Sequence, residues 1–422
     1  MKIENLRWEK NGDRTRVAAS VKWEDCNRSA EEVYFETEDA FSDGLACNPN
    51  AFLVGCIIPA MHFGENRIAI DAEICPELRE GLLNVMHVLL HWYYPKERRP
   101  VRIDALAKKS DLPPSGRSGL HEGFFFSGGI DSFALLRANR LGFNPGHPRW
   151  IKDGFLVYGL EQDVPEIFEF VKSSLADAAS KIGINLIPVY TNLYLNYRKE
   201  DATDGFRFWI DEFGGAALAA VAHAFSSRLR GISIAGNCDP SHLGPWGTHP
   251  LIDPNFSCCE LRVRHECVAL SRLQKTGLIA DWAPALEHLR VCNQYKRYAS
   301  DSLNCGKCEK CIRTMLELLA FNALEKTPAF PTTDVSPELV ARYVKIRNPF
   351  VLSFYMELLD ALSRIGRRDL VTVIKEKIIE YQRKERKEKW KKRFNAMDRQ
   401  FFNSNLCKLI PGVKRGHAAG DI

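Results

Sequence analysis

The sequence contains no apolar run long enough to cross a bilayer. Its most apolar stretch, residues 51–61, is shorter than the roughly 20 residues of a transmembrane helix and contains Pro59. No apolar segment follows the first residues, Met1–Asn5, so we expect no signal peptide. These absences predict a cytoplasmic protein with no membrane partner.

Over most of the chain, basic residues do not outnumber acidic ones. The formal net charge of +5 comes from the run RKERKEKWKKR at 383–393, and the remainder is close to neutral. A protein that coats nucleic acid spreads Lys and Arg over a broad surface. We therefore expect that only this C-terminal segment could bind tRNA or a partner protein. The alternative is a charged, solvated helix, and the sequence is compatible with an oligomer.

The sequence provides no reason to place its 13 cysteines in an oxidising compartment. In a cytoplasmic chain, cysteines are expected to be metal ligands or buried thiols. Four of them share a tight spacing: Cys292, Cys305, Cys308 and Cys311. Four thiolates suit tetrahedral Zn²⁺ and leave no open position, which predicts a structural site. An iron–sulfur cluster is the alternative for the same ligands, and four unliganded thiols are the other.

No Walker motif, Gly-x4-Gly-Lys-Ser/Thr, follows the predicted strand at 123–126. A different glycine-rich turn stands there, made of Ser127, Gly128, Gly129, Ile130, Asp131 and Ser132. The three phenylalanines before it predict a buried strand of a parallel sheet, and Asp131 and Ser132 are expected to cap the following helix. Free N–H groups at such a turn favour phosphate, and a carboxylate there could hold Mg²⁺. The alternative is an ordinary strand-to-helix turn.

Strands and helices alternate after this turn. The expected strands are 123–126, 155–158, 185–190 and 231–235, and the expected helices are 131–140, 164–181 and 211–228. This alternation predicts an α/β fold with a doubly wound parallel sheet, whose site lies at the carboxyl ends of the strands. Tyr158 and Gly159 end one strand at that edge.

The flanking segments have other patterns. Residues 1–118 predict an α+β domain of unknown role, residues 119–330 the nucleotide domain, and residues 331–422 a helical, basic extension. Turn-forming residues predict a linker at 111–119, and we expect a disordered tail at 414–422. The expected N-terminal strands are 14–23, 33–35, 52–58 and 67–71, with a helix at 78–93; the C-terminal helices are 337–346, 351–365 and 369–402.

The loop Ser-Gly-Gly-x-Asp-Ser resembles the pyrophosphate loop of the N-type ATP pyrophosphatases, the PP-loop superfamily. Followed by Cys…Cys-x-x-Cys-x-x-Cys, it resembles the 7-cyano-7-deazaguanine synthase (QueC) family over roughly residues 121–325, about half of the chain. The resemblance implies a PP-loop fold with a zinc knuckle. It also implies an ATP-dependent ligase that adenylates 7-carboxy-7-deazaguanine or a similar carboxylate, releases pyrophosphate and forms an amide or nitrile. QueC-like proteins with extra domains occur in anti-phage systems, and this chain is more similar to those.

The resemblance also implies roles for individual residues. The loop residues with Tyr158 and Gly159 would bind ATP, Asp131 would position Mg²⁺, and Lys275 would neutralise the leaving pyrophosphate. The family's Gly-Tyr-Pro-Asp-Cys-Arg substrate segment is replaced here by residues 248–254. The candidates for binding the substrate are Asp239, His249 and Asp253. Two rival functions are a tRNA-modifying PP-loop ATPase and a non-catalytic nucleotide-binding subunit of a defence complex.

Overall fold

The computed structural model describes residues 1–94, 98–108, 119–160, 163–198, 207–292, 294 and 302–402. Most of the predicted linker at 111–119 and the whole predicted tail at 414–422 lie outside these ranges. The chain divides into two compact units, Met1–Leu303 and Asn304–Ile422. Among the described helices, none combines the length and the apolar character that spanning a bilayer requires.

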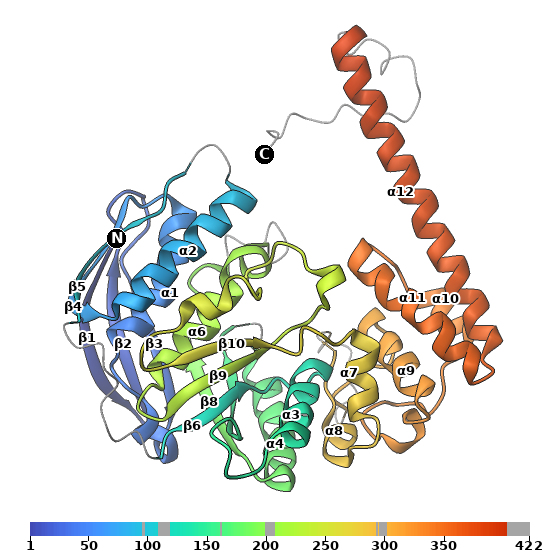
Figure 1. Cartoon of the computed structure of the whole chain (residues 1–422), viewed down its shortest axis with the longest axis horizontal. Helices are drawn as coiled ribbons and strands as arrows, with labels where there is room; N and C mark the ends of the chain where they lie inside the picture. Colours follow the sequence, from blue (N-terminus) through green and yellow to red (C-terminus); the bar gives the residue numbers. More distant parts are fainter. Residues whose placement is uncertain are drawn as a thin grey trace. The chain divides into compact units, whose positions relative to one another are not determined.

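A ten-stranded sheet runs through the first unit in the order β10-β9-β6-β7-β8-β3-β2-β1-β4-β5 (Figure 1). Its first five strands are all parallel: β6 (His121–Phe125), β7 (Ile151–Tyr158), β8 (Asn185–Thr191), β9 (Leu229–Ala235) and β10 (Arg262–Glu266). The carboxyl ends of these strands therefore lie along one edge. The prediction of an α/β protein with a mostly parallel sheet is confirmed.

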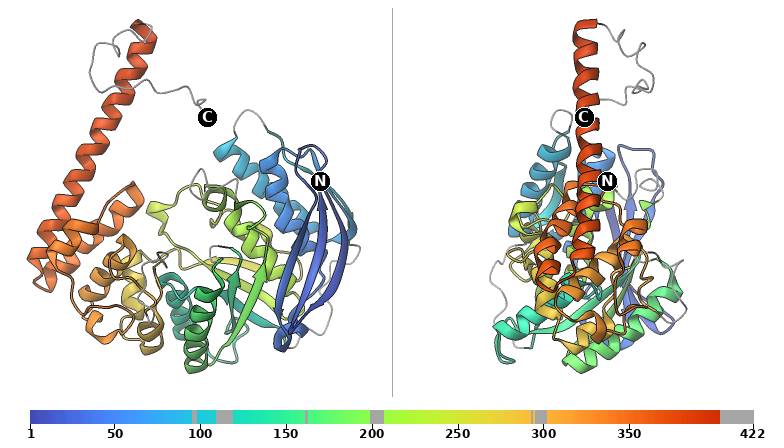
Figure 2. Two further views of the ribbon diagram at one scale, coloured as in Figure 1. Left: turned by 180° about the vertical axis from the view of Figure 1, so that it is seen from behind. Right: turned by 90° about the vertical axis from the view of Figure 1, so that its right-hand side faces the viewer.

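Helices cover both faces of the parallel strands because the chain changes direction within the sheet. From β6 it passes through α3 (Ile130–Gly142) to β7 and through α4 (Pro165–Ile182) to β8. It then returns through α6 (Gly214–Ala224) to β9, on the other side of β6. Right-handed crossovers in opposite directions place their helices on opposite faces. Accordingly, α3 and α4 lie together, away from α6 (Figures 1 and 2).

The N-terminal strands extend the same sheet. The antiparallel strands β3 (Glu31–Glu38), β2 (Arg14–Lys22) and β1 (Lys2–Asn11) are followed by β4 (Arg67–Ile74) and β5 (Arg102–Ala107). Strand β3 pairs with β8, with Phe35 opposite Thr191. The sheet therefore continues across the boundary predicted at residue 118. The turn-forming residues at 111–119 suggest two domains in the sequence, although backbone hydrogen bonds join strands of both parts, β3 and β8.

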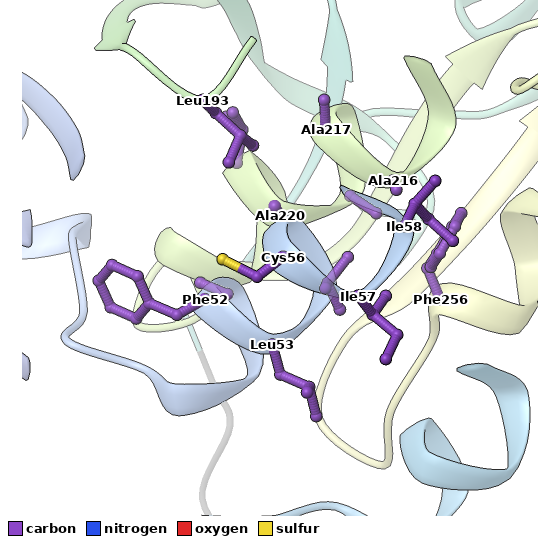
Figure 3. Close-up of a cluster of buried hydrophobic side chains, with 14 of the residues drawn as sticks. Phe52, Leu53, Cys56, Ile57, Ile58, Leu193, Ala216, Ala217, Ala220 and Phe256 are labelled. Carbon is purple, nitrogen blue, oxygen red and sulfur yellow. The ribbon is translucent and has the colours of Figure 1, made fainter. Parts of the chain in front are cut away.

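The strand expected at 52–58 is wrong, because this segment is part of helix α1 (Pro49–Phe63). The side chain of Asn48 accepts a hydrogen bond from the N–H of Asn50, and Gly64, with φ of 83°, ends the helix. Every residue from Asn50 to Met61 is buried, and the helix packs against α6 (Figure 3). A helix that is apolar all round has no polar face, so its sequence pattern matches that of a buried strand.

The other expected elements of the first unit differ from the structure in smaller ways. Helix α2 (Pro76–Tyr93) and most strands lie where the sequence predicts them. We recognised no sequence signal for β1, β5 or β10. The helix expected at 211–228 is a π-helical turn, Phe208–Phe213, that leads into α6.

The second unit is helical. It contains α9 (Glu309–Ala320), α10 (Pro337–Tyr343), α11 (Pro349–Arg364) and α12 (Arg368–Phe402). Its part after residue 331 matches the predicted helices, and α9 was not predicted. Helix α12 packs on α10 and α11 through Leu370, Val373, Ile374 and Ile378, all of them buried. Beyond this contact the basic segment 383–393 continues the helix with mostly exposed side chains. Two shorter helices, α7 (Arg272–Ile279) and α8 (Ala283–His288), belong to the first unit.

Gly81 tests how tightly helix α2 packs against the segment that precedes β10. A Cβ atom at Gly81, in α2, would overlap the carbonyl oxygen of Asn255 in the short helix Asp253–Phe256. We expect Gly81→Ala to lower the free energy of unfolding by about 1–3 kcal/mol, because neither backbone can yield without moving its neighbours. Gly142→Ala, at the end of α3 with nothing within 4 Å, is the control and should cost nothing. Urea unfolding followed by circular dichroism measures both, and equal stabilities would contradict the packing argument.

Candidate functional site

The predicted loop lies where the order of the parallel strands reverses. From β6 the chain proceeds to β7 on one side, whereas β9 and β10 lie on the other side. In open α/β sheets, ligands bind in the crevice outside the carboxyl ends of the strands at such a point. Residues 127–132 follow β6 there, Gly236 follows β9, and Tyr158 with Gly159 ends β7. The topology therefore places the two predicted segments and Gly236 at one edge of the sheet.

The loop between β6 and α3 is held by its own backbone. Gly128 has a φ of 76°, which favours glycine, and its carbonyl accepts a hydrogen bond of 2.7 Å from the N–H of Arg290. Gly129 is the N-cap of α3, and no side chain caps the helix, so the expected capping by Asp131 and Ser132 is wrong. The Ser132 hydroxyl instead donates to the Gly129 carbonyl at 3.0 Å. The first N–H groups of α3 thus lack a capping side chain, which suits an anionic ligand.

The structure brings Asp131 and Lys275 together although 144 residues separate them. Lys275 Nζ lies 3.2 Å from Asp131 Oδ1 and also donates to the carbonyl of Gly236. The other carboxylate oxygen, Oδ2, lies 3.0 Å from Nη1 of Arg272. Arg272 and Lys275 are three residues apart in α7 and so share one face of that helix.

Arg272 is a site residue that the sequence analysis missed. The side chain of Lys275 is fully buried, whereas that of Arg272 is 11% exposed. Lys275 is therefore placed to hold Asp131 and the end of β9, and Arg272 is better placed to reach a ligand. Its spacing from Lys275 was the signal that could have found it.

Tyr158 and Gly159 shape the end of β7. Gly159 has a φ of 92°, and a Cβ atom there would overlap the carbonyl oxygen of Thr191, so only glycine fits. The Tyr158 hydroxyl donates to the carbonyl of Asp163 at 3.0 Å. These contacts order the strand end beside the loop.

The three residues predicted to bind the substrate lie in different surroundings. Asp239 accepts a hydrogen bond of 2.8 Å from the N–H of Ser241 and pairs with His242, so it organises its own turn.

Asp253 is fully buried; it accepts from the N–H of His249 at 3.2 Å and lies 2.7 Å from Nδ1 of His265. Burial raises the pKa of Asp253. Burial, and then the neighbouring His265, lower the pKa of His249. The structure thus joins Asp253 to His249 and His265 and leaves Asp239 with His242.

Sequence reasoning also missed His265. It lies on β10, a strand that we did not predict, and its partner Asp253 comes from a short 3₁₀ helix. Only the folded chain brings the two together.

The four cysteines form one cluster. The Sγ atoms of Cys292, Cys305, Cys308 and Cys311 all lie within 4.8 Å of one another. The separation of 3.9 Å between the Sγ atoms of Cys305 and Cys311 is close to the edge of a tetrahedron with Zn–S bonds of about 2.3 Å. Gly306, with φ of 66°, allows the tight turn between the first two ligands of the knuckle. The cluster fits a metal ion such as zinc, as the spacing predicted.

Known proteins provide no match for the chain. No family model, no curated protein and no solved structure matches it. Its function must therefore be argued from its residues and their geometry.

The cysteine cluster predicts a measurable metal content. We expect the purified protein to hold about one zinc ion per chain, and Cys305→Ser to lose most of it, because a tetrahedral site built from four thiolates needs each of them. Cys47→Ser is the control, since Cys47 lies outside the cluster. Plasma mass spectrometry measures the metal. Iron in place of zinc, with visible absorption from a cluster, would favour the iron–sulfur alternative.

Proposed function

We propose that the chain is a PP-loop ATP pyrophosphatase that acts as a QueC-like ligase. It adenylates a carboxylate, 7-carboxy-7-deazaguanine or a similar compound, and joins the activated acyl group to an amine. The observation that carries this proposal is the Ser-Gly-Gly-Ile-Asp-Ser loop at the strand reversal, whose Asp131 pairs with two cations of α7. A role in an anti-phage system is part of the proposal through the family resemblance.

In this proposal the loop and α7 act on the triphosphate. The uncapped N–H groups of α3 bind the β- and γ-phosphates, and Arg272 neutralises the charge that develops on pyrophosphate. A carboxylate oxygen of the substrate attacks the α-phosphorus, and the bond from that phosphorus to the bridging oxygen breaks. Lys275 keeps Asp131 and the end of β9 in place while this happens.

Mg²⁺ fits Asp131 as one ligand among several. The carboxylate is 25% exposed, but both its oxygens already pair with cations, so phosphate and water oxygens must complete the coordination. Bound there, Mg²⁺ would neutralise charge on the phosphates. Zn²⁺, held by the four cysteines, would have no open position and would serve the structure alone.

A second candidate function is tRNA modification by the same loop. It is favoured by the exposed basic segment 383–393 of α12, where Trp390 is 58% exposed and stacks on Phe394 with the ring planes 16° apart. Basic side chains interleaved with an aromatic ring suit single-stranded nucleic acid. Binding of tRNA that weakens steeply with salt, and that is lost when 383–393 is neutralised, would support this candidate.

Asp131→Asn tests the ligase. We expect it to reduce pyrophosphate release from Mg·ATP by about 100-fold or more, because the neutral amide removes the charge that balances Arg272 and Lys275 and is a weaker Mg²⁺ ligand than a carboxylate. The assay contains 7-carboxy-7-deazaguanine and ammonia. Asp281→Asn, which removes a highly exposed carboxylate paired with Arg137, is the matched control and should keep full activity. A wild-type protein that binds ATP but releases no pyrophosphate with this substrate or with tRNA would instead be a non-catalytic nucleotide-binding subunit.

Arg272→Ala separates the two cations of α7. We expect kcat to fall by about 100-fold with the fold intact, because Arg272 stabilises the leaving group and Lys275 still holds Asp131. Arg262→Ala, which removes an exposed guanidinium paired with Glu77, is the control. Steady-state kinetics and a thermal melt measure both variants. Unchanged kcat would show that Arg272 does not act on the phosphates.

A further inference from the structure

A buried carboxylate–imidazole pair lies beside the proposed ATP site. His265 is in β10, and its Nδ1 is 2.7 Å from Oδ2 of Asp253, whose other oxygen accepts from the N–H of His249 at 3.2 Å. The Asp253 side chain is fully buried and that of His265 is 3% exposed. A carboxylate that accepts from Nδ1–H fixes the tautomer of the ring and leaves the lone pair on Nε2.

Gly236 connects this pair to the ATP site. The edge of the His265 ring packs against Gly236 so closely that a Cβ atom there would lie 2.7 Å from Nε2. The carbonyl of the same glycine accepts the hydrogen bond from Lys275, which in turn pairs with Asp131. The imidazole and the Asp131–Lys275 pair thus contact the same residue at the end of β9.

Nε2 of His265 has no hydrogen-bond partner among the described residues, and it is not among their fully buried polar atoms, so solvent or a ligand can reach its lone pair. Two thiols lie within electrostatic reach of Asp131 and Lys275, those of Cys238 and Cys267. Burial raises the pKa of Cys238 to about 12 and also raises that of Cys267, so both stay protonated at neutral pH. Neither thiol competes with the imidazole as a base.

We propose that His265, oriented by Asp253, is the general base of the second half-reaction. This inference rests on the proposed ligase function. The amine nitrogen attacks the carbonyl carbon of the acyl adenylate, and a C–N bond forms. The bond from that carbon to the phosphate oxygen breaks, AMP leaves with the electron pair, and a proton of the amine passes to Nε2 of His265. In other enzymes, too, a carboxylate that accepts from Nδ1–H orients a histidine whose Nε2 acts as the general base.

The test separates the two half-reactions in the full-length protein. ATP–pyrophosphate exchange with 7-carboxy-7-deazaguanine reports adenylation, and amide formation with ammonia reports the second step. We expect His265→Gln to keep most of the exchange and to lose about 100-fold or more in amide formation. Asp253→Asn should behave similarly, because the amide donates to Nδ1 and so moves the proton to Nε2. His147→Gln, a substitution of an exposed residue stacked on Phe143, is the control.

The outcomes distinguish the base from its alternatives. Equal losses of exchange and amide formation would show that the pair only holds the fold and would overturn the inference, as would unchanged amide formation. Hydroxylamine, a stronger nucleophile, should trap the adenylate in His265→Gln almost as fast as in the wild type. A wild-type protein without exchange would overturn the ligase and, with it, this role. Wild-type exchange with normal amide formation in His265→Gln would overturn the base alone.

Discussion

The buried ammonium of Lys275 is the constraint on which the site depends. A charge without solvent access is tolerated only where partners replace the lost hydration. Here the partners are the carboxylate of Asp131, in the first turn of α3, and the carbonyl of Gly236, at the end of β9. A single side chain of α7 therefore fixes the relative positions of two adjacent strand ends, β6 and β9. The strand reversal becomes a defined site because one cation cannot be buried unless both strand ends are in place.

Close packing at this edge of the sheet also explains why two glycines there cannot be replaced by larger residues. Gly236 must lack a side chain so that the His265 ring can pack against it while its carbonyl takes the Lys275 hydrogen bond. Gly159 must lack one because Thr191 occupies the space. Each glycine marks a place where two segments, distant in sequence, approach at backbone distance. These contacts fix how closely the segments approach at this edge of the sheet.

The sequence predicted features whose cause is local. The loop at 127–132, the cysteine spacing and most helices and strands follow from neighbouring residues. Prediction from the sequence was wrong for α1, because a fully buried helix shows no periodicity of apolar residues. It also missed features that depend on a partner far away in the sequence. The continuity of the sheet depends on β3 pairing with β8, and the Asp253–His265 pair depends on β10. No pattern within either segment specifies these partners, because a strand can pair with many other strands and an imidazole can form hydrogen bonds with many groups.

The start of α3 shows how the absence of helix capping can indicate a ligand site. Helices α7, α10 and α11 begin with a serine or asparagine whose side chain caps the first turn. Helices α2 and α4 lack such a cap but begin with proline, which has no N–H to satisfy. Helix α6 continues from the π-helical turn, and α9, which has neither device, starts directly after Cys308 of the cysteine cluster. Helix α3 also has neither device: Gly129 precedes it, and its one acidic residue of the first turn, Asp131, is held by Arg272 and Lys275. Water or a ligand must accept from its first N–H groups, and the position of this helix start at the strand reversal favours an anionic ligand there.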